Sequence, residues 1–216
     1  MTFEYILNTY KTERYKLYSD IYGNDKVSGV IGFNNYLEYF KHYLGYYTTI
    51  NNDEELITHA VKGMFKYKLN MYLHPHHKNF NDRGGIEKIK RKNDDEALLN
   101  NILDRMDEFE QVIKTNDFAQ LYEFIKTNKE AKLSGLDIYD IALRIGSKYE
   151  IKPTEVFLHK GTLMGLKMLE NKGLVEEDLS LKKTVSIKQL PKALWDMEAT
   201  HIEDFLNVKN RDFMGI

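Results

Sequence analysis

Three histidines within four residues form the densest group of metal-ligand side chains in the sequence. They are His74, His76 and His77, and Asp82 follows five residues later. Neutral imidazole is a common ligand of zinc and related divalent metals, and a carboxylate can complete such a site. The group lacks the His-Glu-x-x-His spacing of helical metalloprotease sites. We therefore keep two interpretations: a metal site, which would suit a metal-dependent hydrolase or nuclease, and an exposed loop.

The stretch from His59 to Lys92 carries a strong positive charge, although the net charge of the whole chain is only −2. This stretch contains nine Lys and Arg residues and only two acids. The nine are Lys62, Lys66, Lys68, Lys78, Arg83, Lys88, Lys90, Arg91 and Lys92. Such clustering attracts polyanions through phosphate contacts that depend on salt.

An acidic stretch follows directly, because residues 93–130 contain ten acids and four bases. The two stretches can neutralise each other as neighbouring elements, or each can form a solvated surface. A third interpretation is that they dock against partners of opposite charge, as in a protein–protein adaptor.

A second candidate for anion binding is the tetrad from His159 to Thr162. If Gly161 breaks a helix, Thr162 can cap a new one, and the free amides together with Lys160 suit a phosphate. The alternative is one helix that runs through Gly161, with His159 in a structural role.

Several chemistries find no support in the sequence. The glycines of Arg83-Gly84-Gly85 precede a basic run, but no Gly-Lys-Ser/Thr follows them, so they do not form a nucleotide-binding P-loop. There is no Gly-x-Ser-x-Gly nucleophile elbow. The absence of cysteine excludes disulfides, thiolate metal sites and cysteine nucleophiles.

The elements that must position these residues are predicted to be helices. Only three prolines interrupt the chain, and apolar residues recur every three to four positions. We expect helices over residues 3–22, 35–47, 52–73, 94–114, 116–125, 136–149, 153–172 and 191–207. Residues 27–32 and 185–187 can form short strands, and residues 74–93 are expected to be a loop. The predicted fold class is therefore all-α, a multi-helix globular fold with at most one or two short strands.

Composition agrees with a folded protein, since 42% of residues are hydrophobic and 30% are charged. No apolar run approaches the roughly 18 residues that a membrane-spanning helix needs, and the first residues do not have the pattern of a signal peptide. We expect a cytoplasmic protein without a membrane partner. A polar stretch near residue 130 suggests an N-terminal helical portion, 1–130, and a compact C-terminal helical portion, 131–216.

The C-terminal portion resembles a recurring pattern in uncharacterised bacterial proteins, to which no activity is attached. The phrases that carry the resemblance are Tyr139-Asp140, Arg144-Ile145-Gly146, Val156-Phe157-Leu158-His159, Gly161-Thr162, Gly165 and Ile202-Glu203-Asp204-Phe205-Leu206. Leu133-Ser134-Gly135 before a helix is also similar to a helix-hairpin-helix element, although Asp137 stands where that motif has its second glycine. The helix-hairpin-helix resemblance implies phosphate binding. Asp140 and Arg144 have the i, i+4 spacing of a surface ion pair.

These observations favour a non-enzymatic protein that binds DNA or RNA through a local basic surface. The expected phosphate contacts are the nine bases of residues 59–92, with Lys160 as an outlier. No cofactor is expected unless the histidine loop holds a divalent metal. The metal-dependent hydrolase and the protein–protein adaptor remain as alternatives, and the sequence leaves open whether the protein is an enzyme.

Overall fold

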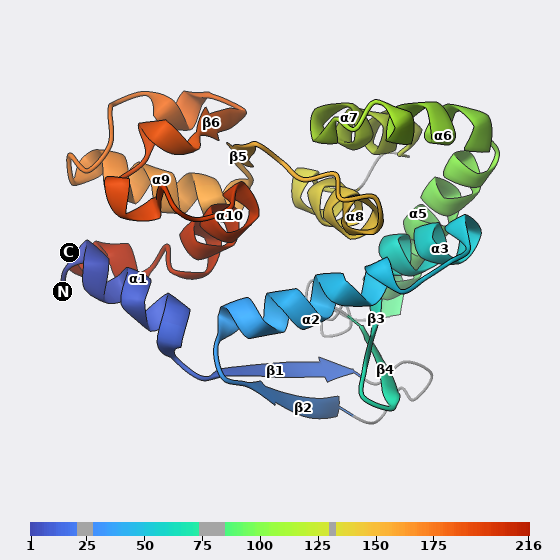
Figure 1. Cartoon of the computed structure of the whole chain (residues 1–216), viewed down its shortest axis with the longest axis horizontal. Coiled ribbons are helices and arrows are strands. Elements are labelled where there is room, and N and C mark those ends of the chain that lie inside the picture. The colour runs from blue at the N-terminus through green and yellow to red at the C-terminus, as the bar shows by residue number, and fades with distance from the viewer. Residues whose placement is uncertain (21–27, 74–84, 130–132) are drawn as a thin grey trace. The chain divides into compact units, whose positions relative to one another are not determined.

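The computed structural model describes residues 1–20, 28–73, 85–129 and 133–216, and for residues 18–20, 28–29 and 85–93 it describes the backbone alone. The described chain is mostly helical, with six short strands paired as three two-stranded antiparallel sheets (Figure 1). This confirms the predicted multi-helix fold, although strands are more numerous than expected. In the described part of the chain, no helix is both long enough and apolar enough to cross a membrane.

Two compact units make up the chain, and neither is continuous in sequence. Unit 1 consists of Met1–Arg14, Asn34–Leu37 and Pro153–Ile216, and unit 2 consists of Tyr15–Phe33 and Glu38–Lys152. The first helix of the chain therefore packs with the C-terminal third.

Unit 2 contains two antiparallel hairpins and most of the longer helices. Its elements are β1 (Tyr15–Asp20), β2 (Ser28–Phe33), α2 (Tyr36–Thr48, whose first two residues belong to unit 1), α3 (Asp53–Lys62), β3 (Met64–Tyr67), β4 (Asn70–Leu73), α5 (Gly85–Leu103), α6 (Met106–Lys114), α7 (Phe118–Asn128) and α8 (Gly135–Lys148). β1 pairs with β2 and β3 with β4, both antiparallel.

A row of tyrosines along α2 forms part of the core of unit 2. Tyr39, Tyr43 and Tyr47 follow each other at steps of four residues, which places them on one side of the helix, and all three are buried. Tyr43 makes edge contacts with Tyr47 and with Phe65 of β3. This packing brings α2 against β3.

Unit 1 combines helices with one two-stranded sheet and several short 3₁₀ helices. Its elements are α1 (Phe3–Thr12), β5 (Glu155–Phe157), α9 (Lys160–Asn171), η2 (Leu179–Leu181), β6 (Thr184–Ser186), η3 (Ile187–Gln189), η4 (Lys192–Leu194), α10 (Ala199–Val208) and η5 (Asp212–Gly215). β5 and β6 pair antiparallel, so the strand predicted near residue 185 is confirmed. Phe3, Phe205 and Phe213 pack ring against ring in its core.

The helix predicted over residues 3–22 is wrong in its second half. α1 ends at Thr12, and the chain continues as β1 paired with β2. Leu17, Ile31 and Phe33 are buried while Lys16 and Gly32 are exposed, and this alternation is the two-residue period of a strand.

The helix predicted to run from residue 52 to His74 is also wrong in its second half. Asn52 caps α3 as expected, through a bond from the amide of Glu55 to the Asn52 side chain. Gly63 then has φ 62°, a left-handed conformation that ends the helix, and β3 begins one residue later.

Two further segments differ from prediction. Residues 85–93, expected to belong to a loop, are the first half of α5, because Lys, Arg and Glu favour helix and no Gly or Pro interrupts residues 86–103. The helix predicted over residues 153–172 is β5 followed by α9, and α9 begins at Lys160 with His159 as its N-cap residue.

Candidate functional site

Three of the predicted phosphate-contacting lysines lie in one short stretch of unit 2. Lys62 is the last residue of α3, Lys66 belongs to β3, and Lys68 lies in the turn between β3 and β4. Lys66 and Lys68 are exposed, Lys62 is half-exposed, and none of the three forms an ion pair with a carboxylate of the described residues. The sequence contains no Asp or Glu between Leu56 and Leu73, so no acid within this stretch offsets their charge.

The turn between β3 and β4 presents its side chains to solvent. Leu69 is 94% exposed, and the Lys68 ammonium lies 5.4 Å from the centroid of the Tyr67 ring. Lys68 has φ 53°, and this left-handed conformation costs a residue other than glycine about 1–2 kcal/mol. Strained residues of this kind concentrate at functional sites.

Aromatic rings lie beside these lysines. The half-exposed ring of Tyr67 packs 5.1 Å from Phe33 and 5.6 Å from the exposed His42, measured between ring centroids. A fixed and partly exposed ring next to lysines offers a nucleic-acid base a surface for stacking.

His59 adds no charge to this surface at neutral pH. Its Nδ1 lies 2.6 Å from the hydroxyl of Tyr46, on α2. Burial lowers the pKa of His59, and Lys62 lowers it further, while Glu55 acts in the opposite direction. The positive potential of this stretch therefore comes from its lysines alone.

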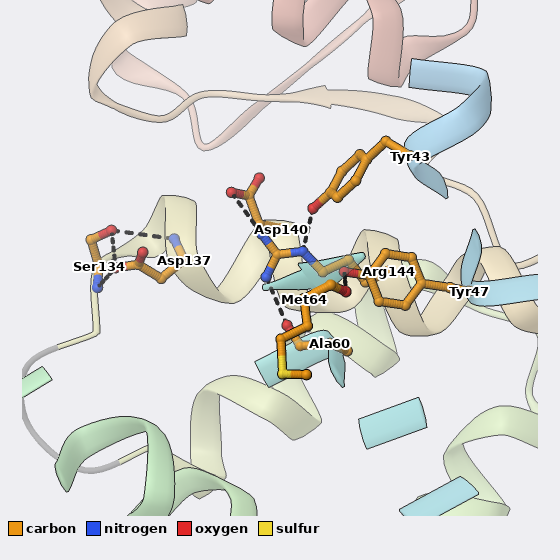
Figure 2. Close-up of polar contacts among 8 residues, drawn as sticks. All are labelled: Tyr43, Tyr47, Ala60, Met64, Ser134, Asp137, Asp140 and Arg144. Carbon is orange, nitrogen blue, oxygen red and sulfur yellow. Dashed lines mark hydrogen bonds and ion pairs between the residues drawn. The ribbon is translucent and has the colours of Figure 1, made fainter. Parts of the chain in front are cut away.

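A buried network holds the end of α3 and the start of β3 in place (Figure 2). Nη1 of Arg144, on α8, donates to the carbonyl of Ala60 at 2.7 Å. The Tyr47 hydroxyl donates to the carbonyl of Met64 at 2.7 Å. Ala60 and Met64 lie two residues before and after Lys62, so both bonds fix the backbone from which the lysines project.

The predicted ion pair between Asp140 and Arg144 is present, but the expectation that it lies at the surface is wrong. Arg144 is fully buried, its Nε donates to the Tyr43 hydroxyl, and its Nη2 lies 3.5 Å from an Asp140 oxygen (Figure 2). Burial raises the pKa of Tyr43 to about 12, against the opposing effect of Arg144. Tyr43 therefore stays neutral at physiological pH and accepts this bond as a hydroxyl.

The basic run of α5 is followed by acids at helical spacing. The bases are Lys88, Lys90, Arg91 and Lys92, and the acids are Asp94, Asp95 and Glu96. Three of these bases precede an acid by four residues, a spacing at which opposite charges attract along a helix. This spacing reduces the expected contribution of α5 to a positive surface, in contrast to the acid-free stretch of Lys62, Lys66 and Lys68.

The remaining predicted residues are not brought into this surface. Lys78, Arg83, His74, His76, His77 and Asp82 lie outside the described residues. Lys160 is exposed and belongs to unit 1. Among the described residues, no group of three or more His, Asp or Glu side chains could hold a metal ion.

The helix-hairpin-helix-like element uses its own carboxylate at the start of α8. The backbone amide and hydroxyl of Ser134 both donate to Asp137, at 2.9 and 2.7 Å, and the amide of Asp137 donates back to the Ser134 hydroxyl (Figure 2). This capping box places a negative charge where a phosphate would bind. It therefore argues against phosphate binding at this helix end.

Part of the tetrad at the start of α9 packs against α10. The hydroxyl of Thr162 is fully buried and donates to the Glu203 carboxylate. Tyr10 and Tyr36 donate to the two oxygens of Asp204, at 3.0 and 2.9 Å. The phrases Gly161-Thr162, Gly165 and Ile202-Glu203-Asp204-Phe205-Leu206 thus meet at the α9–α10 contact in unit 1. The phrases Tyr139-Asp140 and Arg144-Ile145-Gly146 instead lie on α8, in unit 2.

The residues that support the lysine surface, namely Tyr43, Tyr47 and Arg144, were not predicted from the sequence. The signal that points to the tyrosines is their spacing of four residues along one predicted helix. Comparison of the chain with protein-family models, with curated proteins and with solved structures finds no match.

Proposed function

We propose that this protein binds nucleic acid, without enzymatic activity, through the lysines at the end of α3 and on the β3–β4 hairpin. The observation that supports the proposal is the absence of carboxylate partners for Lys62, Lys66 and Lys68 among the described residues. Unpaired ammonium groups attract a phosphate backbone and release its counterions. Phosphate contacts position DNA or RNA without specifying its sequence.

The turn residue Lys68 gives independent support. Asparagine and glycine suit a left-handed turn position better than lysine does. A lysine at this position costs folding free energy, and contact with an anionic partner would offset that cost. The rigid backbone set by Arg144 and Tyr47 limits the entropy that the hairpin would lose on binding.

Replacing Lys66 by glutamine and Lys68 by asparagine is expected to lower the affinity for a labelled oligonucleotide about tenfold. The slope of log affinity against log salt should fall by about 1.4 for a single strand, because each phosphate contact contributes about 0.7. The measurement is fluorescence anisotropy between about 50 and 200 mM salt. The midpoint temperature of thermal unfolding should be unchanged or slightly higher, since asparagine fits the turn.

The matched control is Lys114→Gln with Lys126→Gln. It removes the same charge from one exposed and one half-exposed position of unit 2, but these lysines already pair with Glu110 and Glu123. An equal loss of affinity in the control would show that net charge alone matters and would contradict the proposal. No binding of the unmodified protein at the lowest salt would also contradict it, and selective binding of polyglutamate would favour an adaptor for acidic proteins.

A further inference from the structure

A second stretch without acids lies in unit 1, between Asp178 and Asp196. It contains four lysines, and all of them are exposed. They are Lys182, Lys183, Lys188 and Lys192. None forms an ion pair with a carboxylate of the described residues. The stretch is therefore locally positive, in a chain whose formal net charge is −2.

The only tryptophan of the chain, Trp195, stands at the end of this stretch and is half-exposed. The ammonium of Lys188 lies 4.3 Å from the centroid of the indole, and that of Lys192 lies 5.8 Å from it. The attraction between a cation and the face of an indole holds both ammonium groups close to the ring. Two positive charges and one flat aromatic surface are thus gathered at one place.

The backbone around Trp195 is well anchored. The indole N–H donates to the carbonyl of Leu190 at 2.9 Å, and Leu190 and Leu194 are buried in the core of unit 1. Ser186 and Gln189 form a capping box around η3, which carries Lys188. The ring is therefore held in one orientation before any ligand arrives, which reduces the entropy lost on binding.

We propose that Trp195, Lys188 and Lys192 form a binding site for single-stranded nucleic acid. A base stacks on the indole in place of the Lys188 ammonium, which moves with the Lys192 ammonium to contact the flanking phosphates. An acidic peptide would satisfy the lysines but has no base to stack on the ring. The site shares no residue with the β3–β4 lysines and lies in the other unit, so it does not depend on the function proposed above.

The intrinsic fluorescence of Trp195 reports this site alone, because the chain has no other tryptophan. Titration of the whole protein with a short oligothymidylate or oligouridylate is expected to quench this fluorescence to saturation. A duplex of equal length should quench much less, since its bases are already stacked on one another. The absence of quenching at low salt, or equal quenching by polyglutamate, would overturn the proposal.

Substitution of both lysines, Lys188→Gln with Lys192→Gln, is expected to weaken oligothymidylate binding at this site about tenfold. The control, Lys167→Gln with Lys172→Gln, changes two exposed lysines of the same unit, one in α9 and one at its C-terminal end, and should retain the affinity. Equal weakening by both pairs would overturn the proposal. Variants at Lys66 and Lys68 should leave the quenching of Trp195 intact, so the two sites are tested separately.

Two further variants separate a binding effect from loss of folding. Asp196→Asn removes the acid that directly follows the indole, and it is expected to strengthen binding about two- to threefold. Trp195→Phe should keep more affinity than Trp195→Leu in an anisotropy assay, because phenylalanine retains a ring for stacking. Weaker binding by Asp196→Asn, or equal affinities of the Phe and Leu variants, would contradict the stacking arrangement.

Discussion

Replacing Arg144 by methionine is expected to lower the free energy of unfolding by about 3–5 kcal/mol. Arg144 is fully buried, and its guanidinium donates to the Tyr43 hydroxyl and the Ala60 carbonyl beside Asp140. Methionine fills much of the same volume but donates nothing. The substitution therefore leaves a carbonyl and a largely buried carboxylate without this partner, and such groups are costly to bury.

The measurement is denaturant unfolding followed by circular dichroism, because Trp195 belongs to unit 1 and does not report on unit 2. Arg211→Met is the control, since Arg211 is exposed and its replacement should change stability by less than about 0.5 kcal/mol. Arg144→Lys keeps the charge but cannot form both hydrogen bonds with one ammonium in the same geometry, so we expect an intermediate loss. If Arg144→Met changed the free energy of unfolding by less than about 1 kcal/mol, the network would contribute little to stability.

Replacing Gly165 by alanine is expected to destabilise unit 1 by about 3 kcal/mol. A Cβ atom at this position would lie 2.3 Å from the carbonyl oxygen of Leu206 and 3.0 Å from its carbonyl carbon. Both are backbone atoms of α10, so no rotation of a side chain relieves the overlap. The helices α9 and α10 would have to separate, and their packing in the core of unit 1 would be lost.

Trp195 fluorescence during denaturant unfolding measures this effect in unit 1. Gly45→Ala, in the part of α2 that belongs to unit 2, is a control of opposite sign, because its added Cβ would meet no neighbouring residue within 4 Å. Its stability is followed by circular dichroism, since Trp195 does not report on unit 2. Alanine favours helix over glycine by about 1 kcal/mol, so Gly45→Ala should stabilise the protein. Gly161→Ala should lower the free energy of unfolding less than Gly165→Ala does. The Cβ added at position 161 meets the side chain of Asn207, which can move. Similar stabilities of the two variants Gly165→Ala and Gly45→Ala would contradict the close helix contact.

The two ends of α3, at Asn52 and Gly63, differ in whether the local sequence predicts them. Asn52 caps α3 by a bond to an amide three residues away, so the sequence alone was enough to predict the start of the helix. The end was missed because Met64, Tyr67 and Met71 continue a helical spacing. Gly63 adopts φ 62° there, and the pairing of Met64 with Leu73 replaces the helix by a hairpin.

Arg144 illustrates the same limit for the candidate site. Its spacing of four residues from Asp140 is the same for a surface pair and for a buried pair. Burial depends on α2 and α3, and Tyr43 and Ala60, which receive its hydrogen bonds, lie 101 and 84 residues away. No pattern within one helix contains that information.

The sequence by itself determined the mostly helical character, the cap at Asn52 and the separation of basic from acidic stretches. These properties depend on side-chain type and on neighbours within about four residues. Only the tertiary structure decided which side chains are buried, where hairpins replace helices, and that residues 1–14 pack with residues 153–216. The physical reason is that packing and strand pairing join residues far apart in the chain, and their free energy outweighs the small differences in local preference.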